Sequence, residues 1–375
     1  MALKRRFRSS LYERASGSML LPDINLFTKL CGVTSLGEVL LPSEVRVKGG
    51  NGALHKTLRD LCDGKPISAN RMAKLSSAII EHLLPDDEAL REDVLRQSLK
   101  AIASNSPSRK VSREVVSLGL WYQLYLSIPE ARSPQTKQRL YSLLAASQAT
   151  LREIEKGGLG CLAERCEAAD DQIWRPWFEY LARRLHGQNS IPEEVCLALC
   201  VMGVLGLALV WVAEGARNQD LDEKGQKVLV KNAIELLFAH ADGQANPRMS
   251  VANILEYARQ ETKCETRIEF IHKAFGTSGT RVREAKKFLS GAEIPSHAQT
   301  MNALDVGIDM DPDDRRACRM FVMVAQFIAR SSRKLEELAG ASSFDVCQLY
   351  HNYFVALQAI LEPRSMPARA SDQNR

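Results

Sequence analysis

The sequence has few aromatic residues, and its alternation of apolar and polar residues is weak throughout. Aromatic side chains make up 6% of the 375 residues. No stretch shows the strict two-residue alternation that marks a half-buried β-strand. Leu, Ala, Arg and Glu are abundant, and these residues favour helices. The sequence therefore predicts an all-α fold.

The nine cysteines lack the spacing of a zinc site. Cys161 and Cys166 are five positions apart, and Cys196 and Cys200 are four apart inside an apolar run. No pair of histidines accompanies them, whereas structural zinc sites draw on closely spaced Cys and His residues. We therefore expect reduced, buried thiols, no metal and a cytoplasmic protein. The N-terminal residues also lack the apolar core of a signal peptide.

Motifs of common enzymes are missing as well. Gly157–Gly160 and Gly276–Gly279 are not followed by the Gly-Lys-Ser/Thr of a phosphate-binding loop. The sequence contains neither a Gly-x-Ser-x-Gly elbow nor a His-Glu-x-x-His pair. Positions 309–313 begin like a calcium-binding loop, but Met320 stands where that loop needs Glu. We expect no catalytic residue and no cofactor, so a non-enzymatic function is favoured.

One apolar run dominates the middle of the chain. Val195 to Ala213 contains nineteen consecutive residues without a charge, which is long enough to span a membrane. However, Glu193 and Glu194 precede it, as they would in the first turn of a soluble helix. A helix that is apolar all round can also be the buried centre of an all-α domain. The buried helix is the preferred interpretation, and a membrane span is the alternative.

Two parts of the sequence share an ordered series of short motifs about 225 positions apart. Gly64 and Ile67 recur as Gly291 and Ile294. The other recurring pairs are Pro85-Asp86-Asp87 with Pro312-Asp313-Asp314, Ile102-Ala103 with Ile328-Ala329, Ser108-Arg109-Lys110 with Ser332-Arg333-Lys334, and Gln123-Leu124-Tyr125 with Gln348-Leu349-Tyr350. A nearly constant offset indicates a duplicated helical module.

The repeats divide the chain into five expected regions. These are a basic polar lead-in (1–20), a first helical module (21–130), a central helical domain with the apolar helix (131–245, with the helix at 195–213), a second helical module (246–361) and a disordered tail (362–375). In the first module we expect helices over 23–41, 53–62 and 69–84, the last one capped by Ser68.

Each module contains the same local pattern of a glycine-containing turn, a helix, a glycine and a second helix. In the first module this pattern covers 52–84, and in the second it covers 279–305. The pattern resembles the recognition helix and following turn of repressor-type helix–turn–helix domains, in which the recognition helix enters the DNA major groove.

The resemblance implies that polar residues near each helix start face DNA. These residues are Asn51, His55, Lys56 and Arg59 in the first module and Thr280, Arg281, Arg283 and Lys287 in the second. Arg and Lys side chains read guanine edges or neutralise phosphates. The alternative interpretation is that they form the solvated faces of ordinary amphipathic helices.

The favoured function is therefore non-enzymatic DNA binding, in regulation or in the positioning of DNA or partner proteins. Double-stranded DNA is the expected partner, and tandem modules would let one chain bind two half-sites. The formal net charge of +5 permits this function without requiring it. Two alternatives stay open: a single-pass protein of the inner membrane that spans 195–213, and a helical scaffold for protein partners. The oligomeric state is not predicted.

Overall fold

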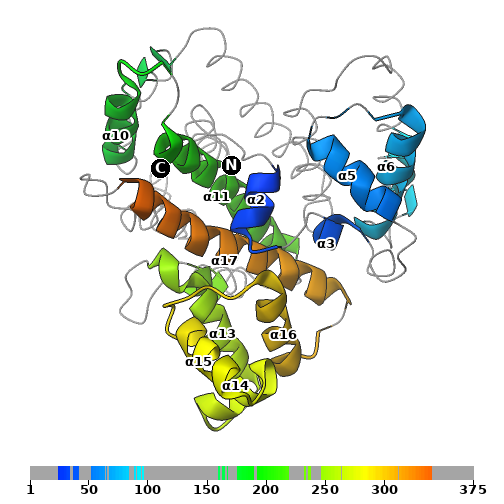
Figure 1. The fold of residues 1–375 in the computed structure, drawn as a ribbon, viewed down its shortest axis with the longest axis vertical. Helices are drawn as coiled ribbons and strands as arrows, with labels where there is room; N and C mark the ends of the chain where they lie inside the picture. Colours follow the sequence, from blue (N-terminus) through cyan, green and yellow to red (C-terminus); the bar gives the residue numbers. More distant parts are fainter. Residues whose placement is uncertain are drawn as a thin grey trace, which may run out of the picture.

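The structure is a computed structural model, shown in Figure 1. It describes residues 24–33, 37–41, 52–83 without 64 and 66, 175–189, 192–218, 246–310 without 263, and 312–339, together with short pieces within 88–96, 159–167 and 232–237. The expected lead-in (1–20) and tail (362–375) lie outside the described residues.

Within the described residues every regular element is a helix, which confirms the all-α prediction. The helices are α2 (Ile24–Leu30), α3 (Gly37–Leu40), α5 (Gly52–Cys62), α6 (Ala69–Leu83), α10 (Arg175–Leu185), α11 (Glu193–Asn218), the 3₁₀ helix η2 (Pro247–Met249), α13 (Ser250–Glu261), α14 (Arg267–Phe275), α15 (Gly279–Leu289), α16 (His297–Gly307) and α17 (Pro312–Ala339).

The long helix α17 organises the arrangement (Figure 1). It packs against α11 on one side and against η2, α13 and α16 on the other. Helix α14 packs on α15 and α16, and α13 packs on α15 and α16, so that α13–α16 form one compact group. To the side, α5 and α6 pack together, with α3 against α6.

The apolar run of the sequence forms most of α11. Val195, Leu199 and Val201 are fully buried, and α11 lies against α17 and α10. At its start, the Arg184 guanidinium bonds to the Glu194 carboxylate, with an Nε–Oε1 distance of 2.9 Å. These described side chains are therefore covered by protein. Among the helices that the structure describes, none is both long and apolar enough to cross a membrane.

The expected continuous helix over 23–41 is wrong, because the chain turns at Gly32. This glycine has a φ of 66°, in the left-handed region that L side chains rarely adopt. Its N–H donates to the Lys29 carbonyl at 3.0 Å, and the Val33 N–H donates to the Thr28 carbonyl at 3.1 Å. These two bonds form a Schellman motif, which ends α2 before α3 begins.

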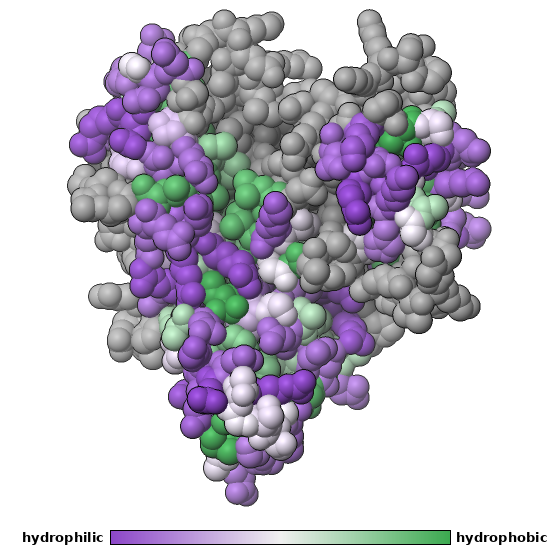
Figure 2. All heavy atoms as spheres, viewed as in Figure 1, coloured by the Kyte–Doolittle hydropathy of each residue, from purple (hydrophilic) through white to green (hydrophobic). Residues whose placement is uncertain are grey.

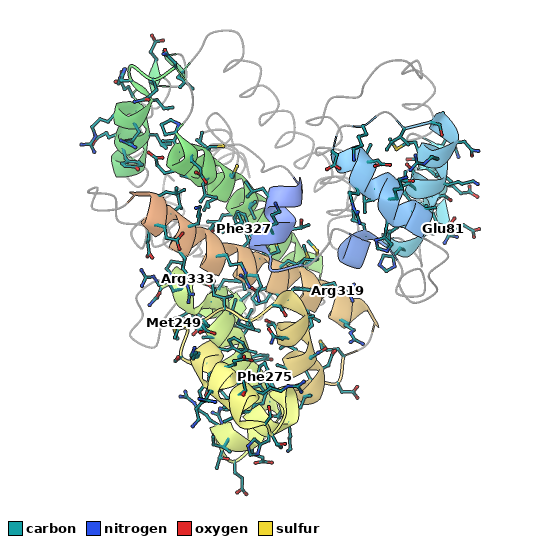
Figure 3. All side chains as sticks on the ribbon, viewed as in Figure 1. Glu81, Met249, Phe275, Arg319, Phe327 and Arg333 are labelled. Atoms are coloured by element: carbon teal, nitrogen blue, oxygen red, sulfur yellow. The ribbon has the colours of Figure 1, made fainter. Side chains whose placement is uncertain are left out.

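The residues around this turn fasten the N-terminal segment to the rest of the fold. The rings of Phe27 and Phe327 lie 5.6 Å apart, and both side chains are buried. Figure 3 labels Phe327 where α17 passes α2. The Gly32 carbonyl accepts a bond from the His297 N–H at 3.1 Å. Because His297 is the first residue of α16, this contact satisfies one of the amides that every helix start leaves free.

Candidate nucleic-acid interface

Helices α14 and α15 are joined by a turn of three residues. Helix α14 ends at Phe275, and α15 begins at Gly279. Between them, Gly276 has a φ of 98°, a backbone conformation in which a residue with a side chain would be strained. The Ser278 hydroxyl then caps α15 by accepting from the Arg281 N–H at 3.4 Å. Helix–turn–helix units also join their two helices through three or four residues, often with a glycine.

Aromatic packing fixes one face of α15. The ring of Phe275 lies 6.4 Å from Phe270 in a T-shaped arrangement and 5.8 Å from Phe288, measured between ring centroids. Ala285 and Leu289 are also buried. In Figure 3, Phe275 lies among α14, α15 and α16. Because these residues occupy one side of α15, the opposite side faces solvent.

Three of the sequence-predicted residues share this solvent side of α15. Thr280, Arg283 and Lys287 are exposed and recur at spacings of three and four, so they line one face. The Lys287 Nζ lies 2.5 Å from Glu293 Oε1. Within the described part of the chain, Arg283 has no carboxylate within salt-bridge distance. The adjacent Lys286, which the sequence pattern did not single out, is exposed beside them.

Arg281 departs from this face. Its side chain runs back along the turn and passes close to Gly276. A Cβ placed on Gly276 would lie 3.2 Å from Arg281 Nη1. The Arg281 side chain therefore borders the α14–α15 turn rather than the centre of the exposed face.

In the first module the structure separates the predicted residues. Lys56 and Arg59 are exposed on α5, whereas Asn51 lies outside the described residues. His55 is half-buried, and its ring fills the space beside Gly37 so closely that an added Cβ would collide with it. The α5–α3 packing therefore occupies the face of His55 that a DNA contact would need.

The described helices of the two modules correspond in position. Helix α5 and helix α15 both have eleven residues, and their starts and ends are both 227 positions apart. The bond from the Asp63 N–H to the Arg59 carbonyl (2.9 Å) recurs as the bond from the Ser290 N–H to the Lys286 carbonyl (3.1 Å).

The second helix of each pair begins at an equivalent serine cap, with one extra residue in the later turn. The Ser68 hydroxyl accepts from the Arg71 N–H at 3.4 Å, and the Ser296 hydroxyl accepts from the Gln299 N–H at 3.2 Å. These caps are 228 positions apart, because Pro295 adds one residue. The second helices differ in length, because α6 has 15 residues and α16 has 11, so the duplication stays a prediction.

Helix α17 holds the turn between α15 and α16 through three long polar side chains. Gln326 Nε2 donates to the Pro295 carbonyl at 3.0 Å, and Arg330 Nη2 donates to the same oxygen at 2.8 Å. Arg333 Nη2 donates to the Gly291 carbonyl at 2.5 Å. The sequence pattern missed this role, because the bonds connect positions more than thirty residues apart.

The arrangement therefore presents a basic face on a helix whose position is fixed by an aromatic core and by buried hydrogen bonds. Figure 2 shows hydrophilic residues over α5 and α6, and a mixture of hydrophilic, neutral and hydrophobic residues over the α13–α16 group. Comparisons of the chain with protein-family models, with curated proteins and with solved structures gave no match.

Proposed function

We propose that the chain is a non-enzymatic, regulatory protein that binds double-stranded DNA through the α14–α15 pair. In this proposal α15 is the recognition helix and enters the major groove, while α14 supports it. The observation that carries the proposal is the three-residue turn at Gly276 followed by a capped helix with an exposed basic face.

The chemistry of that face suits a duplex. Arg283 is exposed near the start of α15, where recognition helices contact base edges. A guanidinium donates two parallel bonds to the O6 and N7 atoms of guanine or to a phosphate. Thr280 lies one turn earlier and offers a hydroxyl to either a base or a phosphate.

The surroundings of α15 support a fixed geometry. Ala285, Phe288 and Leu289 anchor its inner face in the core. The bonds from Gln326, Arg330 and Arg333 hold the turn that follows it. Base readout depends on side chains held in a defined register, and a helix anchored at its inner face and its following turn meets that requirement.

The test is a fluorescence-anisotropy titration of the full chain against labelled duplex DNA at several salt concentrations. We expect binding that weakens as salt rises, because bound phosphates release counterions. Arg283→Ala should weaken binding by roughly tenfold and reduce the salt slope by about one.

The matched control is Lys334→Ala. Lys334 is half-buried on α17, and its Nζ lies 4.0 Å from Glu193 Oε1 of α11, so it belongs to the α11 side of the fold. This variant removes one positive charge and should leave DNA affinity unchanged. Absence of binding at low salt, or equal loss in both variants, would contradict the proposal.

A further inference from the structure

Two cysteines lie one helical turn apart at the start of α11. Cys196 and Cys200 are four positions apart, and side chains at this spacing lie on the same side of a helix. Cys200 is buried in the core with 3% of its surface exposed, whereas Cys196 is half-buried. Among the cysteines that the structure describes, no other two share a helix at a spacing of three or four. The pair therefore consists of an inner thiol and an outer thiol.

A hydrogen bond joins the two thiols. The Cys200 S–H donates to the Cys196 sulfur, and this bond lowers the pKa of Cys196 to about 7, although burial and the Glu193 carboxylate act to raise it. The same bond, together with burial, raises the pKa of Cys200. The outer thiol therefore ionises near neutral pH, while the inner thiol stays protonated and acts as its donor.

The charged groups around this turn of α11 favour a thiolate at Cys196. Cys196 is the fourth residue of α11, and the positive end of a helix dipole stabilises a thiolate there. Two carboxylates also belong to this turn, but each has a cationic partner from another helix. Lys334 Nζ of α17 lies 4.0 Å from Glu193 Oε1, and Arg184 Nε of α10 lies 2.9 Å from Glu194 Oε1.

The spacing of the two cysteines does not suit a disulfide between them. The Cβ atoms of residues four positions apart on a helix are about 5–6 Å apart. A disulfide brings its two Cβ atoms to roughly 3.5–4.5 Å. A bond between Cys196 and Cys200 would therefore distort the start of α11. A sulfur atom that belongs to a separate molecule meets no such restriction at the half-buried Cys196.

We propose that Cys196 is a modification site that forms a mixed disulfide with low-molecular-weight disulfides, and that the hydrogen bond from Cys200 prepares it for this reaction. The Cys196 thiolate attacks one sulfur of the small disulfide. A new S–S bond forms to Cys196, the original S–S bond breaks, and the other half leaves as a thiolate that takes a proton from water. Cys200 is not oxidised. The reaction does not involve the α14–α15 pair, so it is independent of DNA binding.

The first test incubates the full chain with oxidised glutathione and maps the modified cysteines by mass spectrometry. We expect one glutathionyl group on Cys196, which dithiothreitol removes. Cys318 is the internal control, because it is also half-buried but has no cysteine one turn before or after it in α17. It should react more slowly. A disulfide between Cys196 and Cys200, or a rate at Cys318 equal to or above that at Cys196, would overturn the proposal.

The second test measures the rate at which iodoacetamide alkylates Cys196 as a function of pH. In the wild type the rate should rise with a midpoint near pH 7, because the thiolate is the nucleophile. Cys200→Ala removes the donor and should move the midpoint towards the ordinary value of about 8.5. Cys200→Ser keeps a donor and should restore most of the low midpoint.

The role of Cys200 is wrong if the wild type and Cys200→Ala share one midpoint, since a contribution to packing alone would not move it. Circular dichroism at matched concentration checks that both variants keep their helix content. The wild type is decisive even if a variant fails to fold, because a wild-type midpoint of about 8.5 or higher would overturn the proposal.

Discussion

The side-chain amide of Gln326 donates to the carbonyl oxygen of Pro295 at 3.0 Å, although 31 positions of the chain separate the two residues. Gln326 is fully buried and also donates to the Thr300 hydroxyl at 2.9 Å. Its own oxygen accepts from Arg330 Nε at 3.1 Å. This one side chain therefore connects α17 to both the α15–α16 turn and α16.

The first prediction concerns this connection. Gln326→Leu keeps a similar volume but leaves Thr300 and Arg330 each without one bond inside the fold. An unsatisfied buried polar group costs about 1–3 kcal/mol. We expect the free energy of unfolding in urea to fall by this amount. Gln260→Leu, on the exposed face of α13, should change it by no more than about 0.5 kcal/mol. Equal effects would show that the buried bonds do not stabilise the fold.

The second prediction concerns Gly32. A Cβ at this residue would lie 3.0 Å from Arg330 Nη2 and 3.1 Å from Gln326 Oε1. Gly32→Ala should therefore lower the free energy of unfolding by about 1–2 kcal/mol through the left-handed backbone, and by a further amount through disturbance of the buried network. Gly187 has a φ of 71° and no described neighbour within 4 Å of such a Cβ. Gly187→Ala should therefore lower the free energy of unfolding through the backbone conformation alone. Thermal unfolding should show a larger fall in the unfolding temperature for Gly32→Ala than for Gly187→Ala. The reverse order would contradict the close packing of Gln326 and Arg330 against Gly32.

Some of this fold could be predicted from the sequence because the signals are local. The helix expected over 53–62 is observed as α5, and the one over 69–84 is α6. Both predictions depend on the spacing of glycine, serine and apolar residues within a short stretch of sequence. The break at Gly32 was missed because apolar residues continue on both sides of it. The burial of α11 could not be decided either, since an apolar helix suits a membrane and a protein core equally.

The candidate site divides in the same way. The exposed face of Thr280, Arg283 and Lys287 follows from helical spacing, which the sequence contains. The burial of His55 against Gly37 and the hold of Gln326 on Pro295 depend on contacts between distant parts of the chain.

The third prediction tests the equivalence of the two serine caps. Ser296 and Ser68 each accept a bond from the backbone of the third residue of the helix that follows. Substituting either serine by alanine should lower the free energy of unfolding by about 1 kcal/mol. Replacement by Asp, which also caps helices, should restore most of the loss. If only one of the two alanine variants has a lower free energy of unfolding, the two helix starts are not structurally equivalent.

The fourth prediction concerns the pH dependence of stability. Burial, with a smaller effect of the nearby Arg319 charge, lowers the pKa of His297 from 6.5 to about 4. Because the folded pKa is depressed, the contribution of the neutral ring is fully present above pH 6.5 and is lost as pH falls towards 4. The loss should amount to at most about 3 kcal/mol. Urea unfolding at several pH values should show it.

The control for this prediction is His297→Gln, which should flatten the pH profile between pH 6.5 and 4 relative to wild type. His272→Gln, at an exposed residue of α14, should leave the profile unchanged. An unchanged profile in His297→Gln would mean that the ring does not titrate as its burial requires.

The central claim, that α15 is the surface that meets DNA, is tested most directly by amide hydrogen exchange of the full chain with and without duplex. At the start of α15 the Arg281 N–H donates to the Ser278 hydroxyl and the Val282 N–H to the Ser278 carbonyl. The amides of Gly279 and Thr280 come before these bonds, and amides at helix starts exchange readily unless something covers them. The account predicts slower exchange at residues 279–283 when the duplex is bound, with no change at 52–56. Unchanged exchange at 279–283 under conditions where the duplex is bound, or protection at 52–56 instead, would contradict it.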